Sequence, residues 1–142
     1  MRLQILFTLI ASLIISPIWA AESAPIGETP WVATHINGNN IKGNPPTLTI
    51  EQDRAGFRAF GSGGCNRYTG KATLEGNNRL QFGMMASTRM ACLDDVDGQE
   101  ADYFRALQTV RGYHLNQNDL ILLDKDFNKV VEFKTTPESR PH

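Results

Sequence analysis

Beyond residue 30, most of the chain consists of short stretches in which apolar and polar residues alternate. Such alternation is typical of β-strands with one buried face, because successive side chains point to opposite sides of a strand. In residues 47–51, for example, Leu48 and Ile50 would share the buried face. The pattern predicts strands at residues 31–36, 47–51, 57–60, 68–74, 113–116, 119–123 and 130–133, and a further strand that begins at residues 80–82.

The apolar period changes between residues 97 and 111, where the sequence predicts one helix. Asp97 and Glu100 have the spacing of a capping box, with Asp97 as the N-cap residue. Gly112 follows as a C-terminal stop. Apolar side chains recur at three-residue intervals, which suits one face of a helix, at Ala101, Phe104, Leu107 and Val110.

These elements predict an α+β domain that is mainly β. Short turns such as Asn37-Gly38 separate neighbouring strands, and short connections favour antiparallel pairing. We therefore expect a curled antiparallel sheet or open barrel of about eight short strands. The helix at about residues 97–111 would cover one side or one mouth of it.

The first 20 residues have the order of a secretory signal peptide. Arg2 precedes an apolar run at residues 5–15, which is shorter than the roughly 20 residues of a membrane span. Ala20 and Ala21 are small residues suited to cleavage, and no cysteine nearby could accept a lipid. We expect a periplasmic protein without a membrane span after cleavage, built as a flexible lead-in (21–29), one domain (30–135) and a flexible tail (136–142).

Composition excludes several function classes. The formal net charge of the 142 residues is −1, which gives no electrostatic case for binding nucleic acid, since such binding usually needs a basic face. Two Cys and three scattered His do not fit the spacing of zinc fingers or iron–sulfur sites. Neither a nucleophile elbow nor a pair of neighbouring histidines is present. We expect a monomer that is not an enzyme and holds no metal or cofactor.

Cys65 and Cys92 are the two cysteines of the chain. In an exported protein, a pair of this kind is expected to form a structural disulfide. The alternative is a redox-active pair, but the short Cys-x-x-Cys spacing that lowers a thiol pKa is missing.

Met84, Met85 and Met90 lie close to Cys92 in the chain. Soft sulfur ligands could bind Cu(I) in the periplasm, but methionine commonly fills gaps in a core. We expect core packing.

Two loops resemble ligand sites without meeting their requirements. Residues 61–64 are rich in glycine but lack the Lys-Ser/Thr ending of a phosphate loop, so a bend or bulge is expected. Residues 124–128 copy the opening of an EF-hand loop, but Lys129 replaces the glycine of position six. We expect a hairpin turn there.

Asn66, Arg67 and Arg89 are the candidate binding residues. Each arginine flanks a cysteine segment, so a disulfide would bring the two segments together. In a structural role, the arginines would donate to nearby carbonyls or to acids such as Asp94 and Asp95. In a functional role, they would form a small patch that recognises anionic groups.

The same stretch resembles the META domain family of bacterial envelope proteins, which includes heat-shock proteins of the HslJ type. The resemblance rests on Gly-Cys-Asn-Arg-Tyr at 64–68 and Thr-Arg-Met-Ala-Cys at 88–92, with Trp31 before them and a Glu-bearing helix after them. It extends over about residues 30–134. It implies a partly open β-barrel with a helix and a role in envelope stress tolerance, and no known catalytic residue. Many members of the family are lipoproteins, but the signal pattern of this chain has no cysteine that could accept a lipid.

The sequence therefore predicts a binding module that acts in envelope stress. Its ligand could be an apolar molecule such as an acyl chain held in the barrel under the helix. Alternatively, its surface could dock another envelope protein, as small inhibitors of envelope hydrolases do. A thiol-redox or hydrolytic enzyme is the least favoured interpretation.

The leader generates a prediction about the mature protein. Because Ala20 and Ala21 end the signal pattern, the exported chain should begin at Ala21 or Glu22 and appear in the osmotic-shock fraction. N-terminal sequencing of the purified protein checks this. An intact Met1 would contradict it.

Overall fold

A computed structural model describes residues 26–93 and 95–135 of the chain. The signal peptide at 1–20, residues 21–25 of the lead-in and the tail at 136–142 lie outside the described residues. The strands are β1 (Trp31–Ile36), β2 (Asn39–Asn40), β3 (Thr47–Asp53), β4 (Gly56–Ser62), β5 (Arg67–Glu75), β6 (Arg79–Ser87), β7 (Gly112–Asn116), β8 (Asp119–Leu123) and β9 (Lys129–Thr135). A short 3-10 turn, η1 (Val96–Gly98), leads into the helix α1 (Gln99–Thr109).

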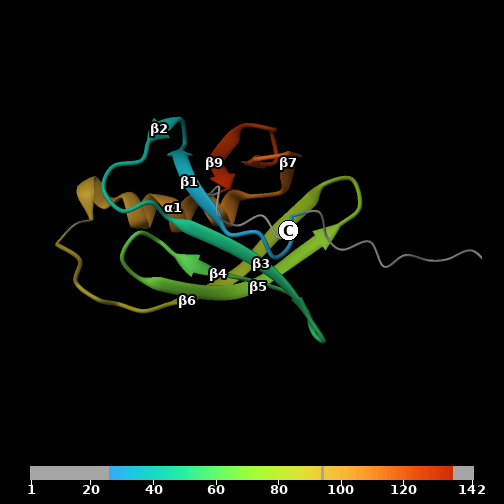
Figure 1. Cartoon of the computed structure of the whole chain (residues 1–142), viewed down its shortest axis with the longest axis horizontal. Helices are drawn as coiled ribbons and strands as arrows, with labels where there is room; N and C mark the ends of the chain where they lie inside the picture. Colours follow the sequence, from blue (N-terminus) through green and yellow to red (C-terminus); the bar gives the residue numbers. More distant parts are fainter. Residues whose placement is uncertain (1–25, 94, 136–142) are drawn as a thin grey trace, which may run out of the picture.

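The nine strands form one antiparallel sheet in the order β2-β1-β3-β4-β5-β6-β7-β8-β9. β1 also pairs with β9, so the sheet curls into an uneven ring of eight strands with β2 at its margin (Figure 1). The ring is weakest between β6 and β7, which share the single residue pair Arg79–Gly112. This architecture confirms the predicted fold class.

Helix α1 packs against the ring on both of its sides. It contacts β6 on one side and β9 and β1 on the other (Figure 1). Its buried side chains, Tyr103, Ala106 and Leu107, join a core that includes Trp31 and Phe133. The helix thus adds its apolar face to the core between β6 on one side and β9 and β1 on the other. No helix within the described ranges is long and apolar enough to cross a membrane.

Two tyrosines form a polar contact inside this core. The hydroxyl oxygens of Tyr68 and Tyr103 lie 2.7 Å apart, and Tyr68 also donates to the carbonyl oxygen of Thr47 at 2.7 Å. Burial raises the pKa of both phenols above the ordinary value, so they stay protonated. The chain of bonds joins α1, β5 and β3.

Some strands have other bounds than the sequence predicted, because backbone pairing rather than apolar alternation defines them. Asn39 and Asn40 belong to no predicted strand, but they pair with Ile36 and His35 to form β2. β6 continues through Ser87, well beyond the predicted start at residues 80–82. The lead-in also contributes to the core, since Ile26 is fully buried and accepts a hydrogen bond from the Trp31 indole. The ordered chain therefore begins before residue 30.

The capping box predicted for the helix is wrong. Asp97 lies in η1 with φ 57°, and Gly98 is the N-cap residue in a left-handed conformation. The carboxylate of Asp95 accepts the backbone N–H of Glu100 at 3.1 Å. The side chain that caps the helix therefore belongs to the residue two positions before Asp97. The helix ends at Thr109, and Gly112, the predicted stop, already belongs to β7.

Gly61 allows β3 and β4 to approach each other. A Cβ atom at this position would overlap the carbonyl oxygen of Thr47 and lie 2.8 Å from its carbonyl carbon. That carbonyl group accepts the tyrosine hydrogen bonds, so it cannot move without disturbing the core.

We therefore expect Gly61→Ala to destabilise the fold by about 3 kcal/mol, a loss on the order of 10 °C in melting temperature. Gly83→Ala is the matched control in a neighbouring part of the sheet, because a Cβ atom there makes an ordinary 3.5 Å contact with Lys71. Thermal unfolding of both variants tests this. Equal melting temperatures for the two would contradict it.

Candidate functional site

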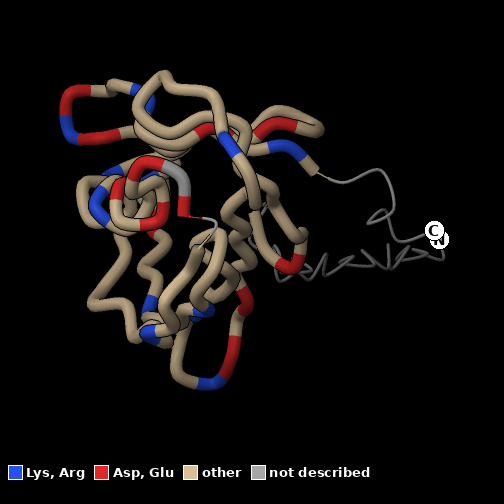
Figure 2. Tube along the Cα trace, turned by 90° about the vertical axis from the view of Figure 1, so that its left-hand side faces the viewer, with Lys and Arg blue, Asp and Glu red and all other residues tan. Residues whose placement is uncertain are grey.

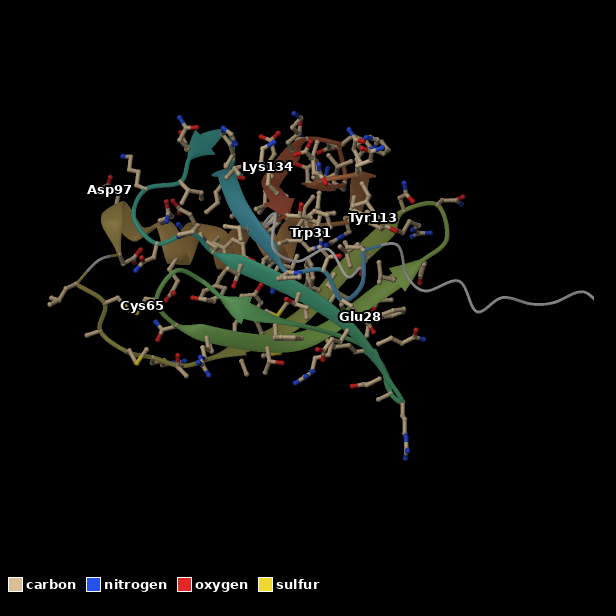
Figure 3. The ribbon with its side chains drawn as sticks, viewed as in Figure 1. Glu28, Trp31, Cys65, Asp97, Tyr113 and Lys134 are labelled. Carbon is tan, nitrogen blue, oxygen red and sulfur yellow. A yellow bond between two sulfur atoms is a disulfide. The ribbon has the colours of Figure 1, made fainter. Side chains whose placement is uncertain are left out.

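The predicted disulfide is present and joins two loops at one end of the molecule. Cys65 lies in the β4–β5 turn and Cys92 in the segment after β6, with their Cα atoms 6.1 Å apart. Figure 3 shows Cys65 near the same end as Asp97, which precedes α1. A disulfide of this kind is typical of an oxidising compartment.

Asn66 organises the segment that follows β6. It is 7% exposed and is the one buried polar residue within the described part of the chain. Its side-chain oxygen accepts hydrogen bonds from the Thr88 hydroxyl at 2.9 Å and the Met90 backbone N–H at 2.7 Å. Its side-chain nitrogen donates to Glu100 at 2.6 Å. The predicted binding residue Asn66 therefore has its polar atoms engaged in holding the site together.

Glu100 is the partner that fixes the β4–β5 turn to the helix. One carboxylate oxygen accepts the backbone N–H groups of Cys65 and Asn66, at 3.0 and 2.7 Å. The other accepts the Asn66 side chain. Hydrogen bonds to a carboxylate are stronger than those between neutral groups, so this cluster is a strong link between α1 and the ring.

The glycine-rich stretch makes this approach of the helix possible. A Cβ atom on Gly63 would lie 2.7 Å from Phe104 and 2.8 Å from Glu100, both on α1. Gly64 has φ 117°, a conformation that side chains rarely adopt. The stretch is the bend expected from the sequence.

Arg67 and Arg89 project from the two loops that the disulfide joins. Both residues are exposed. The backbone of Arg67 pairs with Thr88, because Thr88 donates its N–H to the Arg67 carbonyl at 3.0 Å. No ion pair within residues 26–93 and 95–135 involves either guanidinium. Asp95 caps the helix instead, and Asp94 lies outside the described residues.

Core packing was predicted for the methionines, and for two of them this is wrong. Met84 is 93% exposed and Met90 is 60% exposed, while Met85 packs partly against the core. Leu93 is also fully exposed. These apolar side chains and Arg89 all belong to residues 84–93, which we call the display segment.

The sequence did not reveal two features of this site. Glu100 was assigned to a helix cap, although its side chain points to a turn more than 30 residues away in the chain. The exposure of the display segment was also missed, because methionines beside a strand were interpreted as core residues. One signal of this exposure is that apolar and polar residues do not alternate from Ser87 to Cys92, as they would in a strand with one buried face.

The charges around this end are mixed. Figure 2 shows acidic and basic residues interspersed along the trace. Across the described residues, no group of three or more His, Cys, Asp or Glu could hold a metal ion. The arrangement is suited to contact with another molecule through exposed apolar and cationic side chains.

A family model described as the META domain matches residues 24–137. The chain is also similar to the NMR structure of a protein from Burkholderia xenovorans, with 26% identity, a TM-score of 0.60, and coverage of 80% of this chain and 85% of that one. A second NMR structure has 23% identity, a TM-score of 0.58 and coverage of 77% and 90%, and supports the fold alone. No match was found among curated proteins.

The Glu100 cluster generates a prediction about stability. Glu100→Gln would place an NH2 group against N–H donors, so at least one hydrogen bond to a charged acceptor would be lost. We expect a loss of about 3 kcal/mol, on the order of 10 °C in melting temperature.

Asp102→Asn is the matched control for this measurement. It removes the same charge from the first turn of α1, but its carboxylate is exposed and pairs only with Arg105 among the described residues. Its melting temperature should change by no more than about 2 °C, as exposed ion pairs contribute little. If both variants melted alike, the Glu100 cluster would not be the link between helix and turn.

Proposed function

Since the chain belongs to the META domain family, we propose that it is an exported binding module that docks another protein of the bacterial cell envelope during stress. The docking surface consists of the display segment, residues 84–93, together with Arg67. The module acts by binding and carries out no reaction of its own. The disulfide and the signal pattern at residues 1–20 support a periplasmic location.

The observation that carries this proposal is the exposure of large apolar side chains on a segment that is tied down. Met84, Met90 and Leu93 are 93%, 60% and 102% exposed. Large apolar side chains left exposed on one segment can serve as an interaction site. Asn66 and the disulfide hold the backbone of this segment, so binding would require little loss of conformational entropy.

The chemistry of the surface indicates the chemistry of the partner. Arg89 belongs to the display segment and Arg67 is linked to it through the Thr88 backbone, and both arginines are exposed. Arginine pairs with carboxylates in a two-pronged geometry that gives an interface its specificity. The partner should therefore present an apolar depression bordered by Asp or Glu side chains.

The ring interior gives less support to an acyl ligand. Side chains fill it, including Trp31, Leu48, Tyr103 and Phe133, each almost completely buried. A thiol-redox enzyme also has little support, because Cys65 and Cys92 lack the Cys-x-x-Cys spacing that lowers a thiol pKa.

Site-specific photo-crosslinking in intact cells tests the docking proposal. A photoreactive side chain at Met90 should give one protein adduct of defined mass. The same group at Phe127, which is also apolar and 82% exposed, should not.

Arginine variants then separate binding from folding. In the Met90 background, Arg67→Ala combined with Arg89→Ala should lower the adduct yield about tenfold, because two charge contacts are lost. The melting temperature should stay within about 2 °C, since exposed substitutions rarely change stability. Unchanged adduct yield, or a loss that follows the loss of folded protein, would contradict the proposal.

A further inference from the structure

A concave surface lies at the opposite end of the ring from the disulfide. Its volume is about 480 Å³, within the range of small-molecule sites. It lies where the β5–β6 turn, the junction of α1 with β7, and the β8–β9 turn meet. Figure 3 shows Tyr113, which lines it, well separated from Cys65.

The apolar part of the pocket comes from Tyr113, Leu123 and Phe127. Phe127 is 82% exposed and has φ 63°, an unfavourable conformation for a bulky residue. Asp124 holds this turn, because its carboxylate accepts the backbone N–H groups of Asp126 and Asn128 at 2.8 and 2.9 Å. The turn therefore keeps an aromatic ring at the rim of the pocket although solvent surrounds it.

Cations outnumber anions in the lining. Arg79, Arg111 and Lys125 face Asp124, the one acidic residue among them. Hydrogen bonds from the Asn128 side chain and backbone lower the pKa of Asp124, so it is ionised at neutral pH, and the lining carries a net charge of +2 (three cations minus one anion). Arg79 and Lys125 pair with Glu75 and Asp126 only on the exposed surface, where ion pairs are weak and exchange readily.

Tyr113 adds a polar group to the apolar wall. The residue is 7% exposed, yet its hydroxyl has no hydrogen-bond partner within the part of the chain that the structure describes. No described side-chain oxygen is both fully buried and without a partner, so this hydroxyl reaches the open space. The core tyrosines Tyr68 and Tyr103, in contrast, bond to each other.

We propose that this pocket binds a small amphipathic anion, that is, a carboxylate or phosphate group attached to an aliphatic or aromatic body. The anionic group lies at Arg79 and Arg111, within reach of Lys125. The apolar body lies against Tyr113, Leu123 and Phe127. This site is separate from the docking surface, and neither depends on the other.

Arg111 is positioned for this role by the end of the helix. One of its guanidinium nitrogens donates to the carbonyl oxygens of Val110 and Gln108, at 2.6 and 3.2 Å. Those bonds orient the group while leaving its second terminal nitrogen for a ligand. Arginine presents its donors in a planar fork, which matches carboxylate and phosphate oxygens.

An NMR titration of the purified protein tests the proposal with four probes below their micelle concentrations: decanoate, decyl phosphate, decanol and inorganic phosphate. The two amphipathic anions should shift resonances of Tyr113, Leu123 and Phe127 and bind at least about tenfold more tightly than decanol or phosphate, because only they offer both contacts.

Variants test which residues bind the anionic head group. Arg79→Gln combined with Lys125→Gln should weaken decanoate binding about tenfold while decanol binding stays unchanged. Arg105→Gln, on the exposed side of α1 where it pairs with Asp102, should leave both unchanged.

Other outcomes would overturn the proposal. Equal affinity for decanol and decanoate would indicate an apolar surface without anion recognition. Equal affinity for phosphate alone would indicate a simple anion site. Binding to vesicles of anionic lipid, without binding of the soluble amphiphiles, would indicate a membrane surface contact. Shifts confined to residues 84–93 would place the ligand on the docking surface instead.

Discussion

The fold depends on one carboxylate that attaches the helix to an incomplete sheet. β6 and β7 share a single residue pair, so backbone pairing alone does not close the ring there. Helix α1 packs against β6, β9 and β1, and Glu100 in its first turn accepts hydrogen bonds from Cys65 and Asn66 in the β4–β5 turn. The helix can come this close only because position 63 carries no side chain. A small core is thus completed by a polar contact at its edge.

The same cluster decides what the protein presents to its surroundings. Asn66 uses one side of its amide to meet Glu100 and the other to hold Thr88 and Met90. These hydrogen bonds hold part of the display segment's backbone, while Met84, Met90 and Leu93 are left exposed. The disulfide ties the same two loops covalently. Buried Asn66 thus has a structural role, while the exposed side chains of Arg67 and Arg89 are left for the proposed binding role.

The two ends of the ring differ in what they offer a ligand. The end with the disulfide carries outward-pointing apolar side chains and arginines, which suit a protein surface. The opposite end has a concave surface whose lining combines cations with aromatic rings, which suits a small anion with an apolar body. Between them the interior is filled by side chains such as Trp31 and Phe133, so each end can act without the other.

The sequence by itself determined the strands with strong alternation, the single helix, and the cysteine pairing, because these depend on local periodicity or on there being two cysteines. Residues 31–36 and 119–123 were predicted with the bounds that the structure has. Tertiary structure decided the rest. Asn39–Asn40 has no apolar residue to mark it as a strand and pairs through its backbone alone. Glu100 turned away from its own helix, and Met84 and Met90 were left exposed, because their surroundings come from chain segments distant in sequence, and local periodicity does not record such contacts.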